Sequence, residues 1–131
     1  MSDLSRHQLQ ELRQALEARE AALRNEIIDE LKASSESRWS DLAGSVHDLA
    51  DESVADQLSD FDSAMVNRHL QELREIAQAR RRIAGGSYGE CGDCGGPIGF
   101  ARLKAYPTAG RCVACQGQRE KTFGHEDTPR L

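Results

Sequence analysis

The sequence predicts a mainly α-helical fold, an antiparallel coiled-coil hairpin followed by a C-terminal C4 zinc finger. Three observations lead to this expectation. Two long stretches lack glycine and proline and repeat leucine or isoleucine at helical spacing, and all four cysteines fall within 25 residues. The 131 residues are 38% hydrophobic and 5% aromatic, which is too little apolar material for one large globular core and favours an elongated helical protein.

The first helix is expected from Ser5 to about Ser37. Ser5 and Gln8 have the S-x-x-Q form of a capping box, which satisfies backbone N–H groups at a helix start. The apolar side chains that follow at helical spacing are Leu9, Leu12, Leu16, Leu23, Ile27 and Leu31. From Ser34 to Gly44 this pattern decays, and we expect a loop or tip there.

A second helix is expected from about Asp51–Val54 to Ala84, with Gly85 and Gly86 ending it. Its apolar stripe consists of Val54, Leu58, Phe61 and Met65, followed after a phase shift by Leu73, Ile76 and Ile83. Two helices of about 30 residues, each about 45 Å long, would pack along these stripes as an antiparallel hairpin. The same stripes could instead join two chains, and periodicity alone does not separate these alternatives.

Acidic residues concentrate in the expected turn between the helices. Glu36–Asp62 holds eight acidic residues and one basic residue, whereas Gln78–Gly124 holds eight basic and three acidic residues. An acidic run of this kind can simply be a solvated surface in which aspartates cap a helix. The net charge of the chain is -5. Because DNA binding depends on neutralising phosphates, we expect no direct sequence-specific DNA binding.

The cysteines have the spacing of a tetrahedral zinc site. Cys91, Cys94, Cys112 and Cys115 read C-x2-C-x17-C-x2-C. Two residues between paired cysteines make a tight turn that aims both sulfurs at one point, and four thiolates close the coordination shell. We therefore expect one structural Zn²⁺. Two disulfides would require an oxidising compartment and a redox C-x-x-C pair would require a βαβ context, and the sequence indicates neither.

Several functional classes are not supported by the sequence. No stretch approaches the roughly 20 apolar residues of a membrane span, and the first residues lack the apolar region of a secretory signal. We expect a cytoplasmic protein that does not bind membranes. The histidines are scattered and expected at the surface: His7, His47, His69 and His125. Without a Ser-His-Asp order, a glycine-rich phosphate loop or an H-E-x-x-H motif, we expect no enzyme.

The residues around the cysteines form a longer pattern than metal spacing requires. This pattern comprises Tyr88–Gly95, Pro97–Ile98, Arg102–Ala105, Pro107–Ala109 and Cys112–Gln116. It resembles the DksA/TraR family of bacterial transcription regulators in residue identity as well as in spacing. The resemblance covers roughly Asp48–Gln116 by motif and Ser5–Ser37 by architecture only.

The resemblance implies a partner and a site. Members of this family bind RNA polymerase, insert their coiled coil into its secondary channel, and act there through an acidic tip motif, D-x-x-D-x-A. Counting back from Cys91 places this motif at Asp48, Asp51 and Ser53, with serine in place of alanine. The same count makes Arg68 a candidate polymerase contact, although Arg68 could equally pair with Glu72 on the next turn.

Better-studied members of the family also bind the alarmone ppGpp. The corresponding positions here are Glu72, Glu75, Tyr106 and Gln116. Since two carboxylates disfavour a polyphosphate, the resemblance implies a regulator of transcription initiation without strong ppGpp dependence.

The expected organisation has three parts: a hairpin over residues 1–86 with an acidic tip around 36–56, a zinc finger over 87–120, and a short disordered tail over 121–131. The hairpin predicts a monomer. One alternative is a zinc-finger module that contacts nucleic acid or protein through its basic residues, and another is a dimeric coiled-coil adaptor without a polymerase role.

Overall fold

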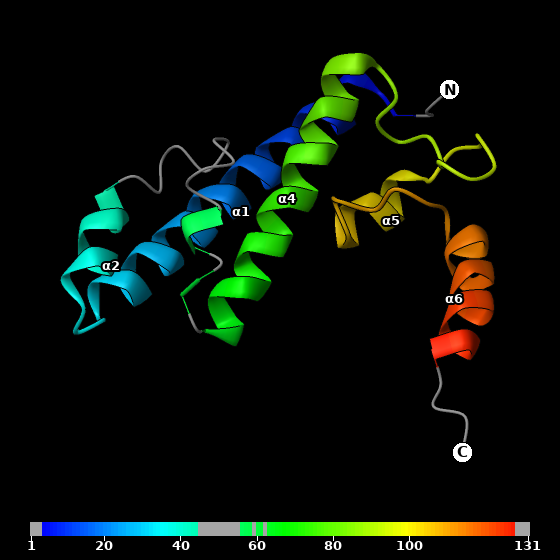
Figure 1. Ribbon diagram of the computed structural model, residues 1–131. Coiled ribbons are helices and arrows are strands. Elements are labelled where there is room, and N and C mark those ends of the chain that lie inside the picture. The colour runs from blue at the N-terminus through cyan, green and yellow to red at the C-terminus, as the bar shows by residue number, and fades with distance from the viewer. Residues whose placement is uncertain (1–3, 45–55, 59, 62, 128–131) are drawn as a thin grey trace. The chain divides into compact units, whose positions relative to one another are not determined.

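The computed structural model describes residues 4–44, 56–58, 60–61 and 63–127, with side chains as far as residue 121. The helices, shown in Figure 1, are α1 (Arg6–Lys32), α2 (Ser37–Leu42), α4 (Ala64–Gly85), α5 (Phe100–Ala105) and α6 (Val113–Asp127). Glu90 and Pro97 form an isolated antiparallel β-bridge. The mainly α-helical fold class is therefore confirmed. None of the described helices combines the length and apolar character that crossing a membrane requires.

The chain folds as two compact units. The first combines the described residues of Met1–Ala15 with those of Ala79–Leu131, and the second comprises Leu16–Gln78. Helices α1 and α4 each contribute one part to each unit. The division expected at residues 86 and 87 stays a prediction.

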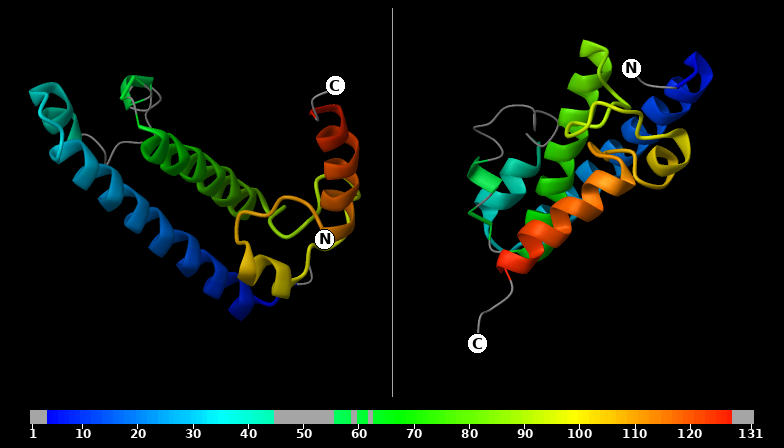
Figure 2. Two further views of the ribbon diagram at one scale, coloured as in Figure 1. Left: turned by 90° about the horizontal axis from the view of Figure 1, so that it is seen from below. Right: turned by 90° about the vertical axis from the view of Figure 1, so that its right-hand side faces the viewer.

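In the second unit, α1 and α4 lie side by side and run in opposite directions (Figures 1 and 2). Their buried residues are Leu16, Leu23, Ile27 and Leu31 from α1, and Val66, Leu70, Leu73 and Ile76 from α4. Spacings of three, four and seven residues are those of a coiled-coil seam. Beside this seam, Arg19 Nε lies 2.5 Å from Glu72 Oε2, and His69 Nε2 lies 3.0 Å from Glu26 Oε2. The predicted antiparallel hairpin is confirmed.

Helix α1 begins as predicted and ends earlier. Ser5 Oγ accepts the N–H of Gln8 at 3.1 Å, and Gln8 Oε1 accepts the N–H of Ser5 at 3.0 Å, which confirms the capping box. The helix stops at Lys32, whereas the sequence predicted Ser37. It stops because the Ser34 N–H bonds the carbonyl oxygen three residues before it, and Ser34 Oγ accepts the Glu36 N–H at 3.2 Å.

A short helix, α2, lies where the sequence predicted a loop. Trp39 is buried on this helix, and its ring meets that of Phe61 edge to face, with centroids 4.9 Å apart. The guanidinium group of Arg38 lies 4.2 Å from the centroid of the Trp39 ring. Burial of a large aromatic ring stabilises this helix. A polar sequence pattern does not reveal such a contact between distant residues, so the loop prediction was wrong here.

Helix α4 starts at Ala64, residues 56–58 are also helical, and the start that the sequence predicted near Asp51–Val54 lies outside the described residues. Ser63 Oγ accepts the N–H of Val66 at 3.1 Å and caps the helix at this point. This start sets which residues of α4 face the seam. Val66 is buried, and Met65, which the sequence assigned to the apolar stripe, is 54% exposed.

Helix α4 ends at the predicted glycines. Gly86 has a φ of 82°, a left-handed conformation that glycine adopts without strain. The N–H groups of Ser87 and Tyr88 then both bond the carbonyl oxygen of Arg82, at 2.9 and 3.1 Å. This turn leads from α4 into the cysteine-bearing segment of the first unit.

Helix α6 extends into the predicted tail. It runs from Val113 to Asp127, whereas the sequence predicted a disordered tail from residue 121, and that division of the chain stays a prediction. Gly117 and Gly124 lower helix propensity by only about 1 kcal/mol each, and the first proline after Cys112 is Pro129. The glycines therefore weaken this helix without breaking it.

Candidate metal centre

Two tight turns carry the cysteines. In the first, Cys91 N–H bonds the carbonyl oxygen of Gly96 at 2.7 Å, and Gly95 N–H bonds the carbonyl oxygen of Cys91 at 2.9 Å. Gly95 has a φ of 75°, where a side chain would be strained. The second turn opens α6, since Cys112 precedes the helix and Cys115 lies in its first turn. The Gly92 N–H bonds the carbonyl oxygen of Gly110 at 2.9 Å and connects the two turns.

The four sulfur atoms converge on one point. All lie within 4.8 Å of one another, and Cys94 Sγ lies 3.9 Å from Cys112 Sγ. Zn–S bonds of about 2.3 Å in a tetrahedron put neighbouring sulfurs about 3.8 Å apart. Cys91 is buried and Cys94 is exposed. The donor set and its spacing fit Zn²⁺ with all four positions filled by protein.

Backbone N–H groups donate hydrogen bonds to three of the sulfurs, which favours their thiolate forms. Cys91 Sγ accepts the N–H of Cys94 at 3.5 Å, Cys94 Sγ accepts that of Gly96 at 3.4 Å, and Cys112 Sγ accepts that of Cys115 at 3.4 Å. The bond from Cys94 lowers the pKa of the Cys91 thiol to about 6. Hydrogen bonding with Cys112 and the other sulfurs raises the pKa of the Cys115 thiol to about 12. Four thiolates this close therefore need a cation between them.

A small apolar core supports the centre. Its buried members beside Cys91 are Tyr88, Ile98, Leu103 and Ala109. The Tyr88 hydroxyl donates to the carbonyl oxygen of Pro107 at 2.8 Å. Burial raises the pKa of Tyr88 to about 12, so this hydroxyl stays protonated at neutral pH. An Arg82 Nη2 donates to the carbonyl oxygen of Thr108 at 3.3 Å, which ties α4 to the loop after α5.

The other predicted site residues are placed as follows. Asp48, Asp51 and Ser53 lie outside the described residues. Arg68 is exposed on α4, and Glu72 pairs across the hairpin with Arg19, not along the helix with Arg68.

Two features were missed by sequence reasoning. His69 is not a solvated surface residue, because its side chain is 15% exposed and contacts Glu26. Asp93 forms ion pairs with Arg111 and Arg119. The sequence did carry a signal for these ion pairs, because Asp93 lies between Cys91 and Cys94 and Arg111 directly precedes Cys112.

Comparison with known proteins agrees with this geometry. Residues 86–121 match the family described as prokaryotic dksA/traR C4-type zinc finger. The RNA polymerase-binding transcription factor DksA of Caulobacter vibrioides is 39% identical over 74 residues, which is 56% of this chain and 52% of that protein. The protein of the same name from Escherichia coli K12 is 28% identical over 109 residues, 83% of this chain and 69% of that one. The chain thus matches about half the length of the Caulobacter relative.

One solved structure extends the likeness beyond the finger. Transcription factor DksA2 from Pseudomonas aeruginosa superposes with a TM-score of 0.62 and 29% sequence identity, over 92% of this chain and 89% of that one. The finger match and the converging sulfurs establish that the four cysteines hold one structural Zn²⁺. The C4 finger thus matches the dksA/traR family, and beyond the finger the chain is similar to proteins named DksA.

Proposed function

We propose that this protein is an RNA polymerase-binding regulator of transcription initiation. The observation that carries the proposal is the likeness to DksA2 over 92% of the chain, which includes the hairpin as well as the finger. The matched relatives are named RNA polymerase-binding transcription factors. A shell closed by four cysteines leaves the metal no open position for catalysis, so the protein acts by binding.

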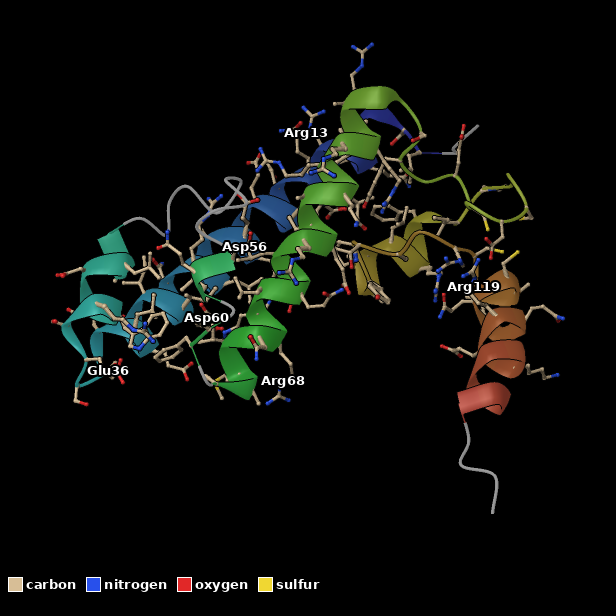
Figure 3. The ribbon with its side chains drawn as sticks, in the orientation of Figure 1. Arg13, Glu36, Asp56, Asp60, Arg68 and Arg119 are labelled. Carbon is tan, nitrogen blue, oxygen red and sulfur yellow. The ribbon has the colours of Figure 1, made fainter. Side chains whose placement is uncertain are left out.

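The hairpin acts by inserting its connecting segment into the secondary channel of the polymerase. Asp48 and Asp51 are the acting groups, and Ser53 takes the place of the family's alanine. The exposed acidic residues around that segment support this assignment: Glu36, Asp41, Asp56 and Asp60, three of which Figure 3 labels. Acidic side chains are attracted into a channel that admits nucleotide phosphates and Mg²⁺.

Arg68 makes a second polymerase contact from α4. Its side chain is exposed, and the carboxylate one turn along the helix is already bound by Arg19. An exposed arginine whose neighbouring carboxylate is already bound is well suited to an acidic or carbonyl-rich protein surface. Arg68→Ala should therefore weaken polymerase binding and leave the folded chain unchanged.

The protein responds weakly to ppGpp. Glu72 carries no positive charge at one of the positions that bind ppGpp in members of the DksA/TraR family. The Arg19 guanidinium lowers the pKa of Glu72 and keeps its carboxylate ionised. Gln116 Nε2 donates to Glu120 Oε1 at 3.1 Å, so its amide is engaged within α6. A polyphosphate approaching these positions meets carboxylates, which disfavour it.

The test is transcription in vitro from a ribosomal RNA promoter with purified polymerase and zinc-loaded protein. The wild type should change transcript yield, Asp48→Asn/Asp51→Asn should lose the effect, and ppGpp should alter neither result. Asp41→Asn/Asp60→Asn is the matched control, because it removes two exposed acidic charges near the same segment outside the motif. An equal loss in both variants would show that net charge, not the motif, is responsible.

Binding and mass measurements separate this function from the alternatives. Direct titration with polymerase should give saturable binding to a 14.5 kDa monomer. A nucleic-acid-binding module would instead bind DNA or RNA with a steep loss of affinity as salt increases. A dimer without affinity for polymerase would contradict the proposal.

A further inference from the structure

Three charged side chains join the two cysteine turns outside the coordination shell. Asp93 lies between Cys91 and Cys94, and its Oδ2 is 3.0 Å from Arg111 Nε. Arg119 Nη2 is 3.4 Å from Asp93 Oδ1, and Arg119 Nε is 3.4 Å from Oδ2. One carboxylate therefore receives two guanidinium groups from different parts of the chain.

The placement of these residues follows that of the metal ligands. Arg111 directly precedes Cys112, and Arg119 lies four residues after Cys115, one turn along α6 on the same side of the helix. Figure 3 shows Arg119 on α6 near the sulfur atoms of the finger. A metal that gathers the four sulfurs also brings Asp93 to both arginines. Helix α6 is then held at its first turn by the metal and at the next turn by Asp93.

We propose that Asp93 is a positioning residue that transmits the state of the metal centre to helix α6. With zinc in place, the ion pairs fix the direction of α6 relative to the first cysteine turn. When zinc leaves, the two turns separate, the ion pairs open and the helix is released beyond its first turn. Metal occupancy thus controls the order of the segment that follows the finger.

Charge balance favours this arrangement. Four thiolates and Zn²⁺ carry a net charge of about -2, and Asp93 adds another negative charge beside them. Arg111 and Arg119 offset most of that charge. The three side chains remain 33–42% exposed, so the contribution is modest and salt-sensitive.

Hydrogen exchange of the full chain tests the proposal. In zinc-loaded protein, Asp93→Asn and Arg119→Gln should each increase amide exchange over residues 116–127 by about three- to tenfold. Exchange over residues 16–32 and 64–78 should not change. Arg13→Gln is the matched control, because it removes an exposed positive charge from α1 in the same unit (Figure 3), and it should leave α6 unaffected.

The comparison of zinc-loaded with zinc-free protein separates transmission from simple stabilisation. Asp93→Asn should increase exchange of α6 in the loaded protein and have no further effect after chelation. Binding of Co²⁺ should give the same tetrathiolate absorption spectrum in wild type and in both variants, showing that the shell is intact. Unchanged α6 exchange in both Asp93→Asn and Arg119→Gln would overturn the proposal, as would an equal effect with and without metal. If Asp93→Asn lost the Co²⁺ spectrum, Arg119→Gln alone would decide the result.

Discussion

The hairpin half and the finger half of the molecule are stabilised by different physics. The second unit buries a continuous seam of leucine and isoleucine between α1 and α4, so its free energy comes from burial of apolar surface. The finger buries few large side chains, chiefly Tyr88, Ile98 and Leu103. Short-range backbone hydrogen bonds and four converging sulfurs hold the finger instead.

Because of this difference, we expect the hairpin and the finger to respond to different perturbations. A segment held by a metal loses its fold when the metal leaves, because binding energy is its folding energy. A segment held by an apolar seam responds to the volume of its core side chains and is indifferent to chelators. The two parts therefore offer independent controls for each other.

Removal of zinc should have the largest effect. Structural zinc contributes about 10–16 kcal/mol in small fingers, so chelation or Cys112→Ser should unfold residues 87–120. Hydrogen exchange and circular dichroism should show loss of α5 and α6, while residues 16–32 and 64–78 stay protected. Zinc should restore the chelated wild type and should fail to restore Cys112→Ser. Equal loss of protection in both units would refute the contrast drawn above.

A cavity in the hairpin seam should have the next largest effect. Leu23 is fully buried on α1, so Leu23→Ala should lower the free energy of unfolding of the hairpin by about 2–5 kcal/mol. Urea titration followed by far-ultraviolet circular dichroism would measure this, and zinc content should not change. Met65→Ala is the matched control, because Met65 is 54% exposed and its loss should cost less than about 0.5 kcal/mol.

Local signals in the sequence predicted the features that local chemistry determines. The capping box at Ser5 and Gln8, the glycine stop at Gly86 and the cysteine turns all depend on residues within a few positions of one another. Leu16, Leu23, Ile27 and Leu31 were also assigned correctly, because a long helix keeps its phase.

Features that depend on distant residues were not predictable in this way. Helix α2 requires Trp39 to meet Phe61, which is 22 positions away along the chain. His69 looked solvated because Glu26 is 43 positions away along the chain. The zinc ligands were predictable from spacing, whereas the ion pair of Asp93 with Arg119 depends on where α6 lies.

Loss of the ion pair between Arg19 and Glu72 should have the smallest effect, and it tests how much charge contributes to the stability of the hairpin. A hydrogen bond from Arg19 lowers the pKa of Glu72 below its ordinary value of 4.5, and partial burial opposes this shift. A lowered pKa in the folded state stabilises the hairpin above about pH 4.5, and this stabilisation is lost as pH falls through the folded pKa. Both side chains remain partly in water, 47% and 35% exposed, so Glu72→Gln should cost only about 0.5–1 kcal/mol at neutral pH.

This cost should diminish as pH falls through the lowered folded-state pKa of Glu72, and it should shrink in high salt. Urea titrations of wild type and Glu72→Gln at about pH 7 and about pH 3 would measure both changes. Glu17→Gln is the control, because it removes an exposed carboxylate from α1 and should change stability little at either pH. If Glu72→Gln cost as much in acid as at neutral pH, lost packing and not charge would be the cause. The hairpin would then depend on side-chain volume even at its charged edge, and the finger would be the part of the molecule in which charge dominates.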